Sequence, residues 1–74
     1  MLKHKTISQI TFKGYRIALV ETESDYVVAL GYHGHKDCWE QGIYFPKSEG
    51  DLESRASATN EYVERISREI RYWL

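Results

Sequence analysis

The stretch that decides the fold is DLESRASATNEYVERISREIRYWL, residues 51–74. Its apolar or near-apolar positions recur at alternating intervals of four and three residues: Leu52, Ala56, Thr59, Val63, Ile66, Ile70 and Trp73. This spacing places the side chains on one stripe of an α-helix, and Asp51 is a favourable residue to cap its start. We therefore predict an amphipathic helix over residues 51–74, with a weak first half at residues 54–60, which are small and polar.

The residues before this helix alternate as β-strands do. We predict strands over residues 7–12, 15–20, 26–32 and 42–45. A tight turn at Lys13-Gly14 joins the first two, because glycine accepts the positive φ that hairpin turns need. Pro46 ends the last strand, since it has no N–H for a ladder. Residues 33–41 are polar and form a long loop.

This order predicts one α+β domain over residues 1–74, with the sheet at about residues 7–45. Consecutive antiparallel strands need only short turns, so the sheet is a three- to four-stranded antiparallel meander, and the helix packs on one face. The predicted core is Ile10, Phe12, Ile17, Leu19, Val28, Leu30, Val63, Ile66 and Ile70. Strands two and three also carry apolar residues on their other face, which predicts a further contact there.

Size and composition narrow the class of protein. A chain of 74 residues forms a small core that often provides no more than about 3–5 kcal/mol of net stability, so partners or metals commonly assist. The single cysteine cannot form an internal disulfide and suits a reducing compartment, so we expect a cytoplasmic protein. No apolar run approaches the length of a membrane span, and no apolar leader core follows the basic start, so we expect no membrane association.

The net charge is −1, but the charges are unevenly distributed. Residues 1–20 carry four cations and no acid, whereas residues 21–54 carry eight acids against two lysines. A chain polarised in this way can bind a charged partner or a second copy of itself. Solvated acidic loops are the simpler interpretation.

Residues 33–40, HGHKDCWE, hold the side chains best suited to metal or thiol chemistry. His33, His35 and Cys38 offer the nitrogen and sulfur ligands that zinc prefers, but their spacing is not that of a common zinc motif. Cys38 as a nucleophile would need a lowered pKa, and the neighbouring acids would raise it. The carboxylates elsewhere are better explained by solvation and by the helix dipole. We therefore expect no catalytic residue and no cofactor.

Two non-enzymatic functions remain. A basic N-terminal hairpin could bind nucleic acid through Lys3, Lys5, Lys13 and Arg16, because a small sheet braced by a helix can enter a major groove. The low net charge and the absence of Lys or Arg from strand three argue against this alternative.

The preferred hypothesis is a protein-interaction module that forms a homodimer. Tyrosine outnumbers phenylalanine six to two, and tyrosine is enriched at half-buried sites and interfaces. The helix spacing is also that of a coiled-coil seam, and its last turn carries more apolar surface than one small sheet needs. The expected contact residues are Tyr72, Trp73, Leu74, Tyr15 and Tyr26.

Overall fold

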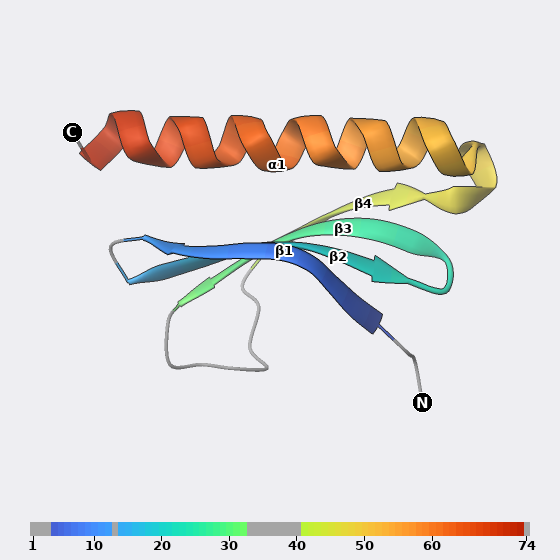
Figure 1. Ribbon diagram of the computed structural model, residues 1–74, viewed down its shortest axis with the longest axis horizontal. Coiled ribbons are helices and arrows are strands. Elements are labelled where there is room, and N and C mark those ends of the chain that lie inside the picture. The colour runs from blue at the N-terminus through green and yellow to red at the C-terminus, as the bar shows by residue number, and fades with distance from the viewer. Residues whose placement is uncertain (1–3, 13, 33–40, 74) are drawn as a thin grey trace.

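The computed structural model describes residues 4–12, 14–32 and 41–73, with only the backbone described at Tyr32 and Trp73. Its elements are β1 (His4–Phe12), β2 (Tyr15–Thr22), β3 (Asp25–Tyr32), β4 (Gln41–Pro46), a 3₁₀ turn η1 (Lys47–Glu49) and α1 (Asp51–Trp73). Figure 1 shows α1 lying along one side of the sheet. The predicted α+β fold, an antiparallel meander with one C-terminal helix, is confirmed with four strands.

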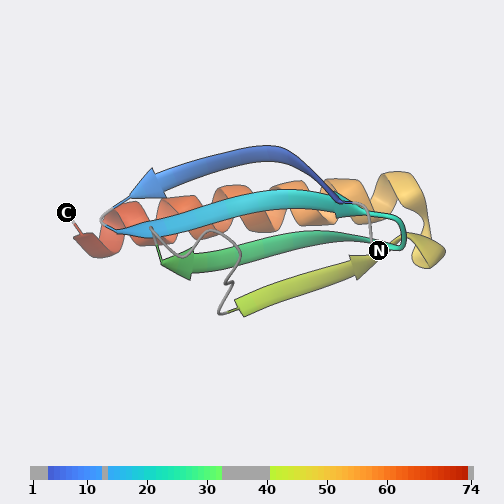
Figure 2. The ribbon, with the colours of Figure 1, turned by 90° about the horizontal axis from the view of Figure 1, so that it is seen from below.

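The sheet is a simple meander in the order β1-β2-β3-β4, with every neighbouring pair antiparallel. Gly14 has a φ of +85°, which a side-chain-bearing residue rarely adopts and which closes the first hairpin. The β1–β2 register shifts between Thr6 and Ser8, so Ile7 is the extra residue of a β-bulge. Figure 2 shows the strands from the face opposite the helix.

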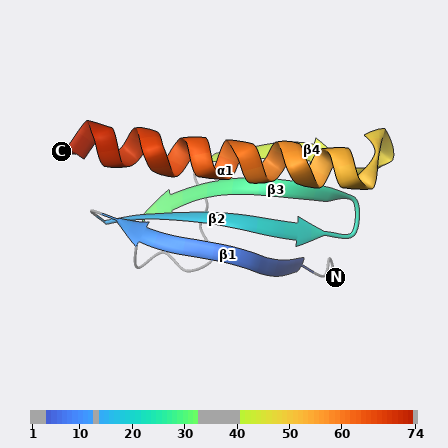
Figure 3. The ribbon, with the colours of Figure 1, turned by 45° about the horizontal axis from the view of Figure 1, so that its top comes forward.

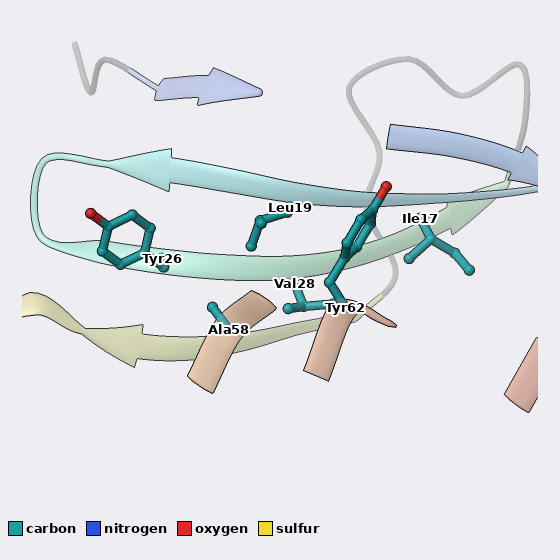
Figure 4. Close-up of a cluster of buried hydrophobic side chains, with 6 residues drawn as sticks. All are labelled: Ile17, Leu19, Tyr26, Val28, Ala58 and Tyr62. Carbon is teal, nitrogen blue, oxygen red and sulfur yellow. The ribbon is translucent and has the colours of Figure 1, made fainter. Parts of the chain in front are cut away.

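The helix covers β2, β3 and β4, and β1 lies farthest from it (Figure 3). The main core cluster joins Ile17 and Leu19 of β2 to residues of β3 and α1 (Figure 4). The remaining buried members are Tyr26, Val28, Ala58 and Tyr62. A second buried cluster, Ala18, Val20, Val27 and Ala29, lies on the sheet face away from the helix. Both faces of the two central strands are therefore apolar and buried.

The first half of α1 is helical from Asp51 and packs against the sheet, which corrects the prediction of a weak start. Ser54 and Ala58 are both buried, because small side chains allow close approach of a helix to a sheet. The Ser54 hydroxyl donates a 2.6 Å hydrogen bond to the Pro46 carbonyl. The Asp51 carboxylate, predicted to cap the helix, accepts the Tyr26 hydroxyl at 3.1 Å. At the start of the helix, the Ser54 N–H donates to the Gly50 carbonyl at 2.9 Å.

The prediction of which face of α1 is buried is wrong, because the helix is rotated about its axis relative to the predicted orientation. Leu52 is 77%, Val63 54% and Ile70 37% exposed, so Val63 and Ile70 do not belong to the core. Tyr62 is only 6% exposed, and its hydroxyl shares a 3.0 Å hydrogen bond with Ser8 of β1. The buried face includes side chains whose polar tips find partners inside the fold, which a count of apolar residues overlooks.

Within residues 4–12, 14–32 and 41–73, no helix combines the length and apolar character needed to cross a lipid bilayer.

Candidate interaction surface

The contacts of α1 show which way its exposed apolar residues point. Residues four apart on an α-helix turn by about 40° around its axis. Ser54, at the start of the series Ser54, Ala58, Tyr62 and Ile66, contacts Pro46 of β4, and Tyr62 contacts Ser8 of β1. The series therefore rotates from the β4 side towards the β1 side. Val63 lies about 100° beyond Tyr62 in the same sense, so it occupies the flank of α1 on the β1 side.

Leu52 and Ile70 share this flank with Val63, because 11 and 7 residues correspond to nearly whole numbers of helical turns. The stripe from Leu52 to Ile70 is about 27 Å long at 1.5 Å per residue. The positions at four-three spacing between its ends are Ala56, Thr59, Val63 and Ile66. None of these carries a charge, so the flank is a continuous uncharged strip.

The strand beneath this flank is also only partly covered. Ile10 and Phe12 of β1 pair with Ile17 and Tyr15 of β2 and stay half-buried. Ile7, displaced by the bulge, is likewise half-buried against the core. The flank of α1 and these three residues of β1 together form an apolar surface, which we call the α1–β1 flank.

The C-terminal part of α1 forms a second feature with β2. Tyr15, Arg65, Arg68, Glu69 and Tyr72 line an open groove of about 420 Å³. Arg68 donates to Glu61 at 2.9 Å, so its charge is already paired within α1. The Arg65 guanidinium beside two phenol rings suits contact with a carboxylate or an aromatic ring, although Glu69 offsets part of the charge.

This groove brings together two of the five residues expected at an interaction surface, Tyr15 and Tyr72. Tyr72 is exposed. Tyr26 lies in the core beneath α1 and is distant from them in the fold. The side chain of Trp73 and the whole of Leu74 lie outside the described residues.

A cluster of polar side chains lies at the opposite end of the helix from the groove, where η1 joins the sheet to α1. Lys47 lies 2.7 Å from the Glu21 carboxylate and 5.0 Å from the centroid of the Tyr26 ring. The Lys47 hydrogen bond lowers the pKa of Glu21 below its ordinary value of 4.5, and the same bond raises the pKa of Lys47 above 10.5. Burial, followed by the hydrogen bond to Asp51, raises the pKa of Tyr26 above 10.0.

Each of these charged groups has a partner within the fold, and the three shifts all favour the protonation states that hold the cluster together. Lys47 also donates its backbone N–H to the Ser24 carbonyl at 2.9 Å. The cluster therefore stabilises the junction between the sheet and the helix, and its lysine is already occupied by a carboxylate. We assign it a structural role.

Of the residues predicted to contact nucleic acid, the two that the structure describes, Lys5 and Arg16, do not lie together. Lys5 pairs with Glu21, whereas Arg16 pairs with Thr11 towards the other end of β2. Five residues along a strand correspond to about 17 Å. Arg16 is half-buried, and Lys3 and Lys13 lie outside the described residues.

The predicted metal ligands His33, His35 and Cys38 also lie outside the described residues. In the described part of the chain, no group of three or more His, Cys, Asp or Glu side chains is arranged to hold a metal ion. Comparisons with protein-family models, with curated proteins and with solved structures found no match to this chain.

Proposed function

We propose that this protein is a non-enzymatic interaction module that forms a homodimer through the α1–β1 flank. The observation that carries the proposal is the exposure of Leu52, Val63 and Ile70 on one uncharged strip of a well-formed helix. Contiguous exposed apolar patches are uncommon on small soluble monomers and usually mark contact sites. The lone cysteine favours a reducing, cytoplasmic setting for this module.

A second copy is the partner that this surface fits best. The strip has the four-three spacing of a coiled-coil seam, in which one helix packs against the equivalent stripe of another. A two-fold axis would place the same strip on both sides of the interface, as in most homodimers. The half-covered residues of β1 would extend the contact beyond the helices, which matters because stable interfaces bury about 1,200–2,000 Å² in total.

The exposed areas of Leu52, Val63 and Ile70 allow an estimate of the affinity of the dimer. Burying a whole Val, Leu or Ile side chain contributes about 1.5–3 kcal/mol. Scaled by their exposed fractions, the three residues provide about 2.5–5 kcal/mol per copy, or about 5–10 per dimer. Association itself costs an estimated 4–15 kcal/mol. The most favourable combination leaves about 6 kcal/mol, which corresponds to a dissociation constant of roughly tens of micromolar. We therefore expect a weak dimer and not an obligate one.

Sedimentation equilibrium from 5 to 500 μM tests this proposal. The wild type should approach twice the 8.7 kDa of the chain at the upper end. Val63→Glu places a charge in the strip and removes about 0.8–1.6 kcal/mol per copy, which weakens the dimer at least tenfold. Ser57→Glu is the matched control, because Ser57 is exposed and lies about 120° around the helix from Val63. A wild type that stays at 8.7 kDa throughout, or equal weakening by both variants, would contradict the proposal.

A further inference from the structure

The outer edge of β4 exposes backbone groups whose identity follows from the register. Asp25 lies opposite Pro46, which places Ser24 opposite Lys47, and the Lys47 N–H donates to the Ser24 carbonyl at 2.9 Å. Hydrogen-bonded positions alternate along an antiparallel pair. Phe45 and Ile43 therefore bond to β3, whereas the N–H and C=O groups of the residues between them point away from the sheet.

The residues whose backbone N–H and C=O groups point away from the sheet are Gly42, Tyr44 and Pro46. Pro46 has no N–H, and its carbonyl is already occupied by the Ser54 hydroxyl at 2.6 Å, which agrees with its outward direction. Among the residues that the structure describes, none bonds to the outward backbone groups of Gly42 and Tyr44, which each offer one donor and one acceptor. Within residues 4–12, 14–32 and 41–73, no strand lies beyond β4 to receive them. The edge is therefore open for about four residues and closed at the Pro46 end.

The two edges of the sheet differ in how they are protected. Native edge strands are usually guarded by charges, bulges or proline. β1 carries the bulge at Ile7 together with Lys5 and His4. β4, with the sequence QGIYFP, has no charged residue, and its register with β3 is regular. Residues 41–44 are all exposed. β4 is therefore the edge better suited to accept another strand.

Side chains on both faces of β4 offer apolar contacts to such a strand. Ile43 lies on the helix side, opposite Val28, and is 36% exposed. Tyr44 lies on the other side and is 64% exposed. Its ring covers Gly42, because a Cβ added to Gly42 would lie 3.2 Å from Tyr44 Cε1. A neighbouring strand would find an aliphatic side chain on one face and a phenol ring on the other.

The acidic residues near Pro46 favour a partner segment that carries positive charge at that end of β4. Asp25 lies opposite Pro46, and two further acids, Glu49 and Asp51, lie shortly after Pro46 in the chain. The Asp51 carboxylate also accepts the Tyr26 hydroxyl, a neutral donor that leaves its charge in place. Lys47, the cation nearest in sequence, is engaged by Glu21. A second copy would present QGIYFP again, which has no lysine or arginine to meet these acids. An extended segment with a basic residue at this end would place a positive charge beside these acids.

We propose that β4 adds a strand from another protein: an extended segment with an apolar residue beside Ile43 and a Lys or Arg near Pro46. Backbone bonds from Gly42 and Tyr44 provide the affinity, and the side chains on the two faces provide the specificity, as in other strand-addition sites. This site goes beyond the proposed self-association and is separable from it, because β4 and the α1–β1 flank lie at opposite edges of the sheet. A dimer would then present two such edges.

The test uses two labelled peptides of alternating valine and threonine, one with two lysines at its N-terminus and one with them at its C-terminus. Fluorescence anisotropy measures their binding to the wild type, and the tighter peptide reports the direction of the added strand. Amide hydrogen exchange of the wild type supplies a second readout that needs no variant. Gly42 and Tyr44 amides should exchange fast alone and be protected at least tenfold with peptide.

Two variants at one position isolate the backbone contribution. Tyr44→Ala removes the ring but keeps the N–H, whereas Tyr44→Pro also removes the outward N–H while sparing the bonds to β3. We expect Tyr44→Pro to bind at least tenfold more weakly than Tyr44→Ala, with thermal melts confirming that both are folded.

Three results would overturn the proposal. The first is no binding of either peptide up to 1 mM (on the order of the weakest affinities considered specific). The second is unchanged exchange at Gly42 and Tyr44 with peptide. The third is protection of both amides without peptide that rises with protein concentration, because a second copy would then occupy the edge.

Discussion

Alanine substitutions at Tyr62 and Val63, adjacent residues of α1, separate its buried face from its exposed flank. Tyr62 is 6% exposed, and Tyr62→Ala removes its ring from the core together with the bond to Ser8. Loss of a buried aromatic side chain costs about 3–5 kcal/mol. A core of this size often provides only about 3–5 kcal/mol of net stability, so we expect Tyr62→Ala to be barely stable or unfolded at 25 °C.

Val63→Ala should change the stability of the monomer very little. Val63 is 54% exposed, so removing its two methyl groups costs about 0.7 kcal/mol of burial. Alanine's higher helix propensity offsets most of this loss. The two substitutions therefore differ by at least about 2 kcal/mol, although the sequence pattern alone ranks Val63 as the core residue.

Urea unfolding followed by circular dichroism at 5 μM protein measures the difference under conditions that favour the monomer. Tyr62→Phe serves as the matched control, because it removes only the hydroxyl and should cost about 0.5–1.5 kcal/mol. A larger loss of stability in Val63→Ala than in Tyr62→Ala would refute the rotation of α1 described above.

Two further predictions concern the polar contacts between the sheet and the helix. Because the pKa of Glu21 is lowered in the folded state, its contribution to stability is complete above pH 4.5 and is lost as the pH falls. Glu21→Gln should therefore flatten the decline of the urea midpoint between pH 5 and pH 3 (roughly the range of carboxyl titration). An unchanged slope would count against the Lys47–Glu21 ion pair. Because the pKa values of Lys47 and Tyr26 are raised, their contributions are present below about pH 10 and are lost above it, so the wild type should also lose stability on alkaline titration. Ser54→Ala leaves the Pro46 carbonyl without its 2.6 Å donor and should cost about 1–3 kcal/mol in urea unfolding, whereas Ser57→Ala at an exposed position should cost almost nothing; equal effects would show that the Ser54 bond is unimportant.

The strand pattern and turn residues predicted the order of the elements because these signals are local. Lys13-Gly14 marks the first hairpin, and Pro46 marks the end of β4. Alternation then places Ile17 and Leu19 on the face that the helix covers, and both are buried as predicted. Strand β1 begins at His4, earlier than the predicted Ile7, because its polar first residues still pair with β2.

The rotation of the helix could not be predicted from apolar spacing alone. Ser54 and Tyr62 are buried because each polar tip finds a partner on the sheet, Pro46 and Ser8 respectively. Those partners lie 8 and 54 residues away in the chain, so only the tertiary fold brings them together. A repeat of small residues with Tyr62 at four-residue spacing, Ser54-Ala58-Tyr62, is the signal that could have indicated this face.

The same difference between the predicted and the observed rotation of α1 leads to the proposed interaction surface. The sheet needs one face of α1, but the apolar residues of α1 extend over a neighbouring flank. Tyr15 and Tyr72, expected as contact residues from composition and position, lie together in the groove at the end of the helix, apart from the α1–β1 flank. The sequence pattern assigns the flank centred on Val63 to the core, because apolar spacing alone does not distinguish a buried stripe of a helix from an exposed one.

The most direct test of the central claim is an isotope-filtered NMR experiment on a mixture of labelled and unlabelled wild-type protein at 500 μM (within the range where a weak dimer of this size is populated). This experiment detects only contacts between copies. The α1–β1 flank predicts intermolecular contacts among the methyl groups of Leu52, Val63 and Ile70, and none from the buried methyl group of Ala58. Intermolecular contacts confined to other surfaces, or none at a concentration where sedimentation shows a dimer, would contradict it.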